Sequence, residues 1–182
     1  MRNNVVLLGV TGGIAAYKSA SLVSLLTQAG VDVRVIMTDS ATRLVAPRTF
    51  QALSGNPVYT ELFPQQGEAH PHIDLARQGD LLCIAPASAN FIGKAANGIA
   101  DDLLSTAYLA FNAPILFAPA MNGAMWQKKS VQRNVQTLFS DGVAFIGPEE
   151  GRFSCGESGV GRMAEAVQIC DKIKEMLTCI KS

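Results

Sequence analysis

Apolar residues in this chain occur in short continuous runs that alternate with longer segments in which they recur every three or four positions. The runs lie at residues 5–10, 31–37, 81–85, 115–118 and 143–146. Each has the length of a strand that is buried on both faces, which is typical of a parallel sheet. Helices are predicted at residues 14–29, 88–96, 101–111 and 163–180. This alternation of strands and helices is the pattern of parallel βα units.

The ends of the predicted helices carry boundary signals. Gly30 follows the first helix, where glycine commonly ends one. Asp101 and Asp102 resemble a catalytic acid pair, but adjacent carboxylates at a helix start more often cap the helix, and we prefer that interpretation. The pattern predicts an α/β fold: a single Rossmann/flavodoxin-like doubly wound parallel sheet in three αβα layers, forming one domain over residues 1–182. Ligands of such sheets bind outside the carboxyl ends of the strands.

A pair of glycines follows the first predicted strand. Gly12 and Gly13 allow the backbone to approach a ligand closely, and the helix that starts at Ile14 directs free N–H groups toward an anion. The hydroxyls of Thr38 and Ser40 follow the second strand, where a dinucleotide-binding protein would have a carboxylate. A mononucleotide phosphate therefore fits better than a dinucleotide. A plain tight turn is an equally weighted explanation of the glycine pair alone.

Two further strand ends carry unusual residues. The third strand is followed by Pro86, Ser88, Ala89 and Asn90, of which Ser88 is also a plausible helix N-cap. The fourth strand is followed by a Pro-Ala-Met-Asn segment that ends in Met121 and Asn122. Methionine is a poor turn residue, so this segment suggests an apolar pocket wall with Asn122 as its polar group. Asn122 is equally suited to cap the turn that follows it.

Several motifs, in the right order along nearly the whole chain, resemble the homo-oligomeric flavin-containing cysteine decarboxylases. They occupy residues 12–18, 72–75, 86–94, 98–103, 119–122 and 155–163. Two departures are visible: Phe91 stands where relatives usually have threonine, and Phe153-Ser154 replace the commoner Leu-Ala. The first puts one polar contact to the flavin in question.

The combination of motifs separates the members of that family. Flavin prenyltransferases resemble neither the His72 motif nor Pro-Ala-Met-Asn, and peptide cysteine decarboxylases lack the 155–163 segment. Phosphopantothenoylcysteine decarboxylases have all three, as this chain does. The resemblance implies an FMN-dependent conversion of 4′-phosphopantothenoylcysteine to 4′-phosphopantetheine in coenzyme A biosynthesis, through thioaldehyde and enethiolate intermediates.

The resemblance also implies roles for individual residues. His72 would be the catalytic base, although a lone histidine in a proline-rich stretch is more often a surface residue. Asn122 would hold the substrate carboxylate, with Met121 and Met163 as further substrate contacts. Cys155, in a glycine-rich segment that we expect to form a mobile loop, would donate the last proton. The FMN phosphate is expected near residues Gly12, Gly13, Ile14, Thr38 and Ser40, and its ring near Pro86, Ser88, Ala89 and Asn90.

Composition adds constraints on partners and location. Charged residues make up 16% of the chain, against about 25% in an average domain, and basic and acidic residues balance at fifteen each. Neutrality gives no reason to expect nucleic acid or a membrane as partner. The low charge favours a homo-oligomer, a trimer or a dodecamer of four trimers according to the resemblance. The first apolar run is too short for a signal peptide, and the four cysteines show no metal spacing, so we expect a cytoplasmic protein.

Alternative functions remain open from the sequence. One is a non-catalytic flavoprotein that resembles the regulatory subunits of phosphatases, although the long acidic extensions of those proteins are missing here. Another is a peptidyl-cysteine decarboxylase. Many bacterial relatives fuse this domain to a phosphopantothenate–cysteine ligase, and the sequence does not distinguish a monofunctional protein from a fragment of such a fusion.

Overall fold

Six strands form the central sheet of the computed structural model, which describes residues 3–63, 70–152, 156 and 158–179. The strands are β1 (Val5–Val10), β2 (Asp32–Met37), β3 (Val58–Tyr59), β4 (Leu81–Ala87), β5 (Ile115–Pro119) and β6 (Ala144–Phe145). Their order is β3-β2-β1-β4-β5-β6, and every neighbouring pair is parallel. The chain thus winds outward from β1 in one direction and from β4 in the other, as the doubly wound prediction requires.

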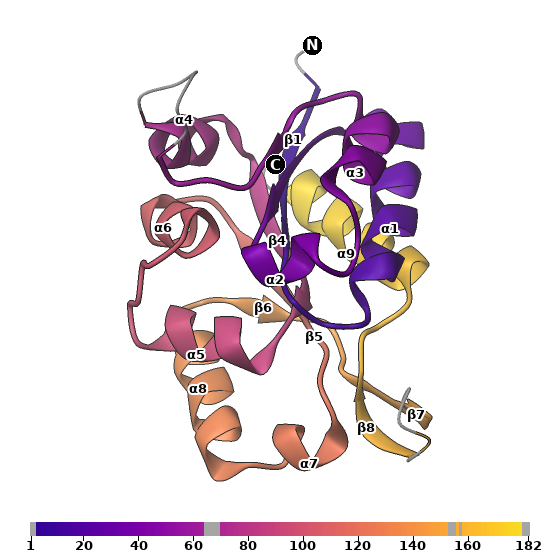
Figure 1. The fold of residues 1–182 in the computed structure, drawn as a ribbon, viewed down its shortest axis with the longest axis vertical. Coiled ribbons are helices and arrows are strands. Elements are labelled where there is room, and N and C mark those ends of the chain that lie inside the picture. The colour runs from indigo at the N-terminus through magenta and orange to yellow at the C-terminus, as the bar shows by residue number, and fades with distance from the viewer. Residues whose placement is uncertain (1–2, 64–69, 153–155, 157, 180–182) are drawn as a thin grey trace.

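Helices cover both faces of this sheet. They are α1 (Ala16–Gln28), α2 (Asp39–Thr42), α3 (Pro47–Ser54), α4 (Pro71–Gln78), α5 (Ala89–Ala96), α6 (Leu103–Ala110), α7 (Gly123–Trp126), α8 (Lys129–Ser140) and α9 (Ala166–Cys179). Figure 1 shows α1, α3 and α9 on one side of the sheet and α4, α5, α6 and α8 on the other. The predicted three-layer αβα arrangement is confirmed.

The alternation of side chains along β1 explains the two layers. Val6 and Leu8 belong to the apolar cluster that includes α1 and α9, whereas Val5 and Leu7 belong to the cluster that includes α4, α5 and α6. Because successive residues of a strand point to opposite faces, a continuous apolar run is what a strand between two helical layers needs. This is why the strand runs could be recognised in the sequence.

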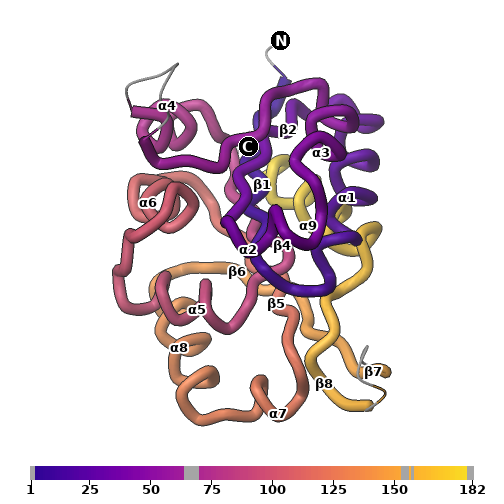
Figure 2. Tube along the Cα trace, viewed as in Figure 1, coloured from indigo at the N-terminus to yellow at the C-terminus, as the bar shows by residue number. Residues whose placement is uncertain are grey.

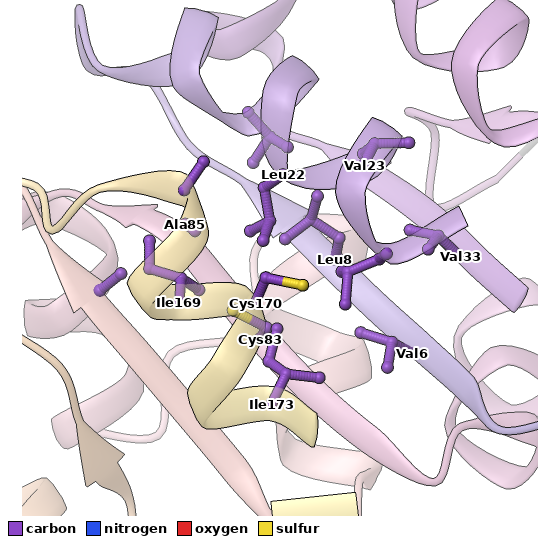
Figure 3. Packing of buried hydrophobic residues seen from close by; sticks show 14 of the residues in the cluster. Val6, Leu8, Leu22, Val23, Val33, Cys83, Ala85, Ile169, Cys170 and Ile173 are labelled. Atoms are coloured by element: carbon purple, nitrogen blue, oxygen red, sulfur yellow. The ribbon is translucent and has the colours of Figure 1, made fainter. Parts of the chain in front are cut away.

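Two cysteines lie within the first of these clusters (Figure 3). Cys83 on β4 and Cys170 on α9 are buried free thiols among valine, leucine and isoleucine side chains. Burial raises the pKa of the Cys83 thiol well above its ordinary value, so it remains protonated. Both behave as the small apolar core residues that cysteine commonly provides.

The structure corrects several boundaries and adds elements. A sixth strand, β3, was not predicted, nor were the helices α2, α3, α4, α7 and α8. The first predicted helix begins at Ala16 rather than Ile14, and the last begins at Ala166 rather than Met163. The proline-rich stretch around His72 is a helix that starts at Pro71, a position where the missing N–H of proline costs nothing.

The segment expected to be a mobile loop is largely an antiparallel hairpin. Its strands are β7 (Glu149–Arg152) and β8 (Ser158–Arg162), which form a separate two-stranded sheet. Cys155 lies outside the described residues. None of the helices within the described ranges is long and apolar enough to cross a membrane.

Candidate active site

The glycine turn between β1 and α1 lies against three other segments. A Cβ atom added at Gly12 would lie 2.4 Å from the Cβ of Ser40, so only glycine allows α2 to approach this closely. A Cβ added at Gly13 would lie 3.6 Å from Cγ of Pro86 and 4.0 Å from the carbonyl oxygen of Ala120. The structure therefore brings the ends of β1, β2, β4 and β5 together at one edge, which we call the carboxyl edge. Four predicted cofactor residues, Gly12, Gly13, Ser40 and Pro86, meet there.

Two hydroxyl groups that the sequence interpretation overlooked hold this edge together. Thr11 is buried, and its Oγ1 donates to the carbonyl oxygen of Pro86 at 2.6 Å and accepts from the amide of Ser88 at 3.1 Å. Ser19 on α1 is also buried and donates from Oγ to the carbonyl of Ala85 at 2.6 Å. The glycine turn and the end of β4 are thus fixed relative to each other. A threonine in an otherwise apolar strand end was the signal that could have revealed the first contact.

The donors at the glycine turn suit an anion. Within the described residues, the amides of Ile14 and Ala15 have no backbone acceptor, as expected for the first amides of a helix. Ile14 and Ser40 are exposed. Thr38, two residues before Ser40, is half-buried, and its Oγ1 accepts from the amide of Ala41 at 3.3 Å. Free N–H groups and a hydroxyl at the start of a helix are the usual partners of a phosphate. The edge therefore fits the phosphate of a mononucleotide.

Ser88 and Asn122 both serve as helix caps. The Oγ of Ser88 accepts from the amide of Phe91 at 3.3 Å, and Oδ1 of Asn122 accepts from the amide of Ala124 at 2.8 Å. The structural alternatives considered for these residues are thus realised. The cap of α7 engages the carbonyl oxygen of the Asn122 side chain, whereas a carboxylate would be bound by its amide nitrogen. The cap itself therefore uses a different atom from the one expected to bind the substrate carboxylate.

The residues expected near the flavin ring differ in exposure. Asn90 is exposed, Ala89 is half-buried and Pro86 is buried. Phe91, the residue that departs from the family pattern, does not face this edge. Its side chain is buried against Tyr108 and Phe117, with ring centroids 6.2 and 5.8 Å away. The substitution therefore places an aromatic ring in the core instead of a side chain at the cofactor.

The two methionines expected to contact substrate lie in different environments. Met121 is half-buried, and its amide donates to the carbonyl of Gly161 at 2.9 Å, which ties the β5–α7 connection to β8. Met163 is only 1% exposed and packs in the cluster of α1 and α9. Its side chain lies in the core beneath the edge, so a substrate contact through that side chain stays a prediction.

His72 is not brought to Asn122, the N-cap of α7, within one chain. It lies near the start of α4, and Figures 1 and 2 show α4 toward one end of the long axis and α7 and β8 toward the other. The side chain is half-buried, and its ring lies 6.2 Å from that of His70. Its Nδ1 is buried and has no hydrogen-bond partner within the described part of the chain. Such an atom is costly unless something else satisfies it.

Asp102 of the acidic pair caps a helix, which agrees with the interpretation preferred from the sequence. Asp102 accepts from the amide of Ser105 at 2.8 Å and forms a capping box with it, while Lys94 at the end of α5 bonds Asp101 at 2.7 Å and Asp102 at 2.9 Å. Burial works to raise the pKa of Asp102, but the Ser105 and Lys94 contacts outweigh it and hold the pKa below its ordinary value. No cluster of metal-ligating side chains occurs among the residues that the structure describes.

Comparison with known proteins agrees with this geometry. The profile of the family described as Flavoprotein matches residues 1–178. The chain belongs to the Flavoprotein family. Among curated relatives of this Flavoprotein chain, the coenzyme A biosynthesis bifunctional protein CoaBC of Bacillus subtilis (strain 168) is 52% identical over 170 residues, which is 93% of this chain and 42% of that protein. CoaBC of Haemophilus influenzae is 46% identical over 174 residues, 95% of this chain and 44% of that protein. The chain thus spans less than half the length of these relatives.

Solved structures of Flavoprotein-like chains extend the agreement to the fold. A PPC decarboxylase mutant complexed with pantothenoylaminoethenethiol superposes with a TM-score of 0.85 at 31% identity, covering 96% of this chain and 98% of that one. The FMN-dependent cysteine decarboxylase SpaF gives a TM-score of 0.83 at 34% identity, with 98% of each chain covered. The family and the fold predicted from the sequence are therefore confirmed.

Proposed function

We propose that this protein is an FMN-dependent decarboxylase that converts 4′-phosphopantothenoylcysteine to 4′-phosphopantetheine in coenzyme A biosynthesis. The observation that carries the proposal is the meeting of the glycine turn, Ser40, Pro86 and Ala120 at one edge. The activity and the cofactor expected from the sequence agree with the names of the relatives, which include coenzyme A biosynthesis proteins, a PPC decarboxylase and FMN-dependent cysteine decarboxylases.

The residues of the carboxyl edge fit FMN. The amides of Ile14 and Ala15 and the hydroxyl of Ser40 would hold the phosphate, with Gly12, Gly13 and Thr38 shaping the turn. Pro86, Ser88, Ala89 and Asn90 would border the ring. Bound flavin supplies reversible two-electron oxidation of the substrate. Decarboxylation of a cysteine unit needs this step, because the oxidised unit can accept the electrons released with CO2.

The remaining chemistry falls to three side chains. His72 would accept a proton from the cysteinyl unit, because neutral imidazole is the side chain poised to do so near pH 7. The amide nitrogen of Asn122 would hold the substrate carboxylate, with the α7 cap fixing its orientation. Cys155, which lies between β7 and β8 in the sequence, would return a proton at the end of the cycle.

The separation of α4 from α7, which Asn122 caps, supports a homo-oligomer with shared sites. In the proposed assembly, a trimer or a dodecamer of trimers, His72 of one copy completes the edge of a neighbour. Exposed apolar side chains beside the glycine turn, Ile14 at 63% and Tyr17 at 61%, are suited to such an interface. The low content of charged residues supports the same assembly. We place the protein in the cytoplasm with its substrate.

A decarboxylase acting on another cysteine unit, such as peptidyl cysteine, is the second candidate, because SpaF, an FMN-dependent cysteine decarboxylase, is 34% identical over nearly the whole chain. The two candidates differ in substrate. The purified protein should be yellow, release FMN on denaturation, and release CO2 from phosphopantothenoylcysteine. CO2 release from peptides ending in cysteine, with none from phosphopantothenoylcysteine, would replace the first candidate by the second. A chromophore other than FMN would contradict both.

A further inference from the structure

The junction between β8 and α9 is attached to both halves of the carboxyl edge. On one side, the carbonyl oxygen of Gly161 accepts from the amide of Met121 at 2.9 Å. Met121 precedes Asn122, which would hold the substrate. On the other side, the carbonyl oxygen of Met163 accepts from Nζ of Lys18 at 3.2 Å. Gly161 and Met163 flank a single residue, so both attachments act on the same short segment.

Lys18 is built into the first turn of α1, directly after the glycine turn. Its Nζ also donates to Oε1 of Glu165 at 2.7 Å, and its side chain is only 11% exposed. Glu165 is held in turn by Arg162, whose Nη2 lies 3.2 Å from the same oxygen. The Lys18 ammonium holds the pKa of the Glu165 carboxyl below its ordinary value. One ammonium group therefore binds a backbone carbonyl and a carboxylate across the junction.

This arrangement differs from an ordinary surface ion pair. Exposed pairs contribute little because solvent screens them and the side chains lose freedom. Lys18 is mostly covered, and its partners include a buried residue's carbonyl, which would lose its hydrogen bond if Nζ were removed. The contact also joins segments that are 145 residues apart in the chain. It fixes β8 relative to the turn that carries the proposed phosphate donors.

We propose that Lys18 is a positioning residue: it anchors the β8–α9 junction to the glycine turn and thereby sets the place of the Met121-Asn122 segment over the cofactor. In this role Lys18 would act on the substrate through Gly161 and Met121 and not by direct contact. The effect of Lys18 on turnover rests on the proposed function, whereas its effect on the backbone does not depend on any substrate.

The first test is hydrogen–deuterium exchange of the FMN-loaded protein without substrate. Lys18→Met should accelerate exchange of the amides in residues 158–163 and of the Met121 amide by about tenfold or more, as loss of a charge-assisted hydrogen bond implies. Lys172→Met is the matched control, because Lys172 makes an exposed ion pair with Glu175 on α9 at 3.0 Å and touches no part of the edge. Equal exchange in the two variants would overturn the proposal.

The second test is turnover. Lys18→Met should raise KM for phosphopantothenoylcysteine by about tenfold with kcat little changed, the pattern of lost uniform binding. FMN content should stay at the native level, and Lys18→Arg should restore most of the loss. Glu165→Gln, at an exposed position, should give a smaller effect in the same direction. A fall in kcat alone, or loss of FMN, would contradict the positioning role, whereas absence of turnover in the native protein would contradict only the proposed function.

Discussion

The carboxyl edge and helix α4 carry the two halves of the predicted chemistry. Within one chain, His72 on α4 and Asn122 at the start of α7 lie toward opposite ends of the molecule. At the carboxyl edge, Gly12 and Ser40 are in direct contact and Thr11 ties the glycine turn to Pro86. On α4, His72 takes part in none of these contacts, and its Nδ1 is buried without a partner in the described residues. The cofactor half is fixed by strand order, because parallel strands end at a common edge. The proposed base is placed by a helix on one face of the sheet, and we propose that it completes the site of another copy.

The largest effect should come from His72. His72→Asn should lower kcat by about 10²–10⁴-fold, as expected for loss of a general base, while FMN stays bound. Asn122→Asp should also be inactive, because a second carboxylate repels that of the substrate.

Mixing these two inactive variants tests the shared site. Refolded or exchanged mixtures should regain up to about a quarter of native activity, because sites drawing His72 and Asn122 from different copies combine at random. Mixtures that form mixed oligomers but stay inactive would contradict the shared site. His72 and Asn122 of one chain would then act in one site.

A substitution at the glycine turn should have the next largest effect. Gly12→Ala forces a Cβ within 2.4 Å of Ser40 Cβ, so α2 must shift, at a cost of about 1–3 kcal/mol for overpacking. If that cost is lost from binding, the Kd for FMN should rise by about 10- to 100-fold. Quenching of flavin fluorescence measures this Kd. Gly93→Ala on α5 is the control, because its added Cβ would meet only ordinary contact with Asn134 at 3.6 Å. Equal FMN affinity in both variants would mean that the turn does not bind the cofactor.

Sequence patterns predicted the carboxyl edge better than its surroundings. β1 and β4 are continuous apolar runs, so both strands and the residues after them were recognised. β3 has only two residues, both half-buried, and offers no run to detect. α8 was missed because Leu138 is its only fully buried residue, and most of its surface is polar. The strands of the hairpin are rich in glycine, which is typical of a loop.

Side-chain roles were harder to predict than elements. The pattern placed Ser88 and Asn122 after strand ends and left capping and ligand binding open for both, and the structure shows that each caps a helix. Thr11 and Lys18 act through contacts with residues 75 and 145 positions away, which no local pattern reveals. The location of His72 depends on the packing of α4 against α6, which the sequence alone does not determine.

The contact between α5 and α6 connects the two regions compared here. Lys94 at the end of α5, which starts at the carboxyl edge, pairs with Asp101 and Asp102 at the start of α6, the helix against which α4 packs. Asp102→Ala removes the capping box and one ion pair, and should lower the free energy of unfolding by about 0.5–2 kcal/mol. Urea denaturation measures this loss. Asp171→Ala, which breaks only an exposed pair with Lys174, is the control and should change stability little.

The smallest effect should appear in the pH dependence of this link. The pKa of Asp102 is lower in the folded protein than its unfolded value of about 3.9, so its contribution is fully present above that value and disappears as pH falls through the folded pKa. The pKa of Lys94 is raised despite some burial, because Asp101 and Asp102 favour its charged form. Its contribution is therefore present below the unfolded pKa of lysine and disappears as pH rises through the folded one.

Asp102→Asn keeps a capping side chain but removes the charge, so it isolates the ionic part of the link. Between pH 6 and pH 3, a range that spans the ordinary titration of aspartate, the native protein should lose more of its stability to urea than Asp102→Asn does. The two stabilities should therefore converge as the pH falls. Parallel stability profiles would show that the Lys94 pairs do not stabilise the contact between α5 and α6. The attachment of α4's layer to the carboxyl edge would then depend on the apolar packing of α5 against α6 alone.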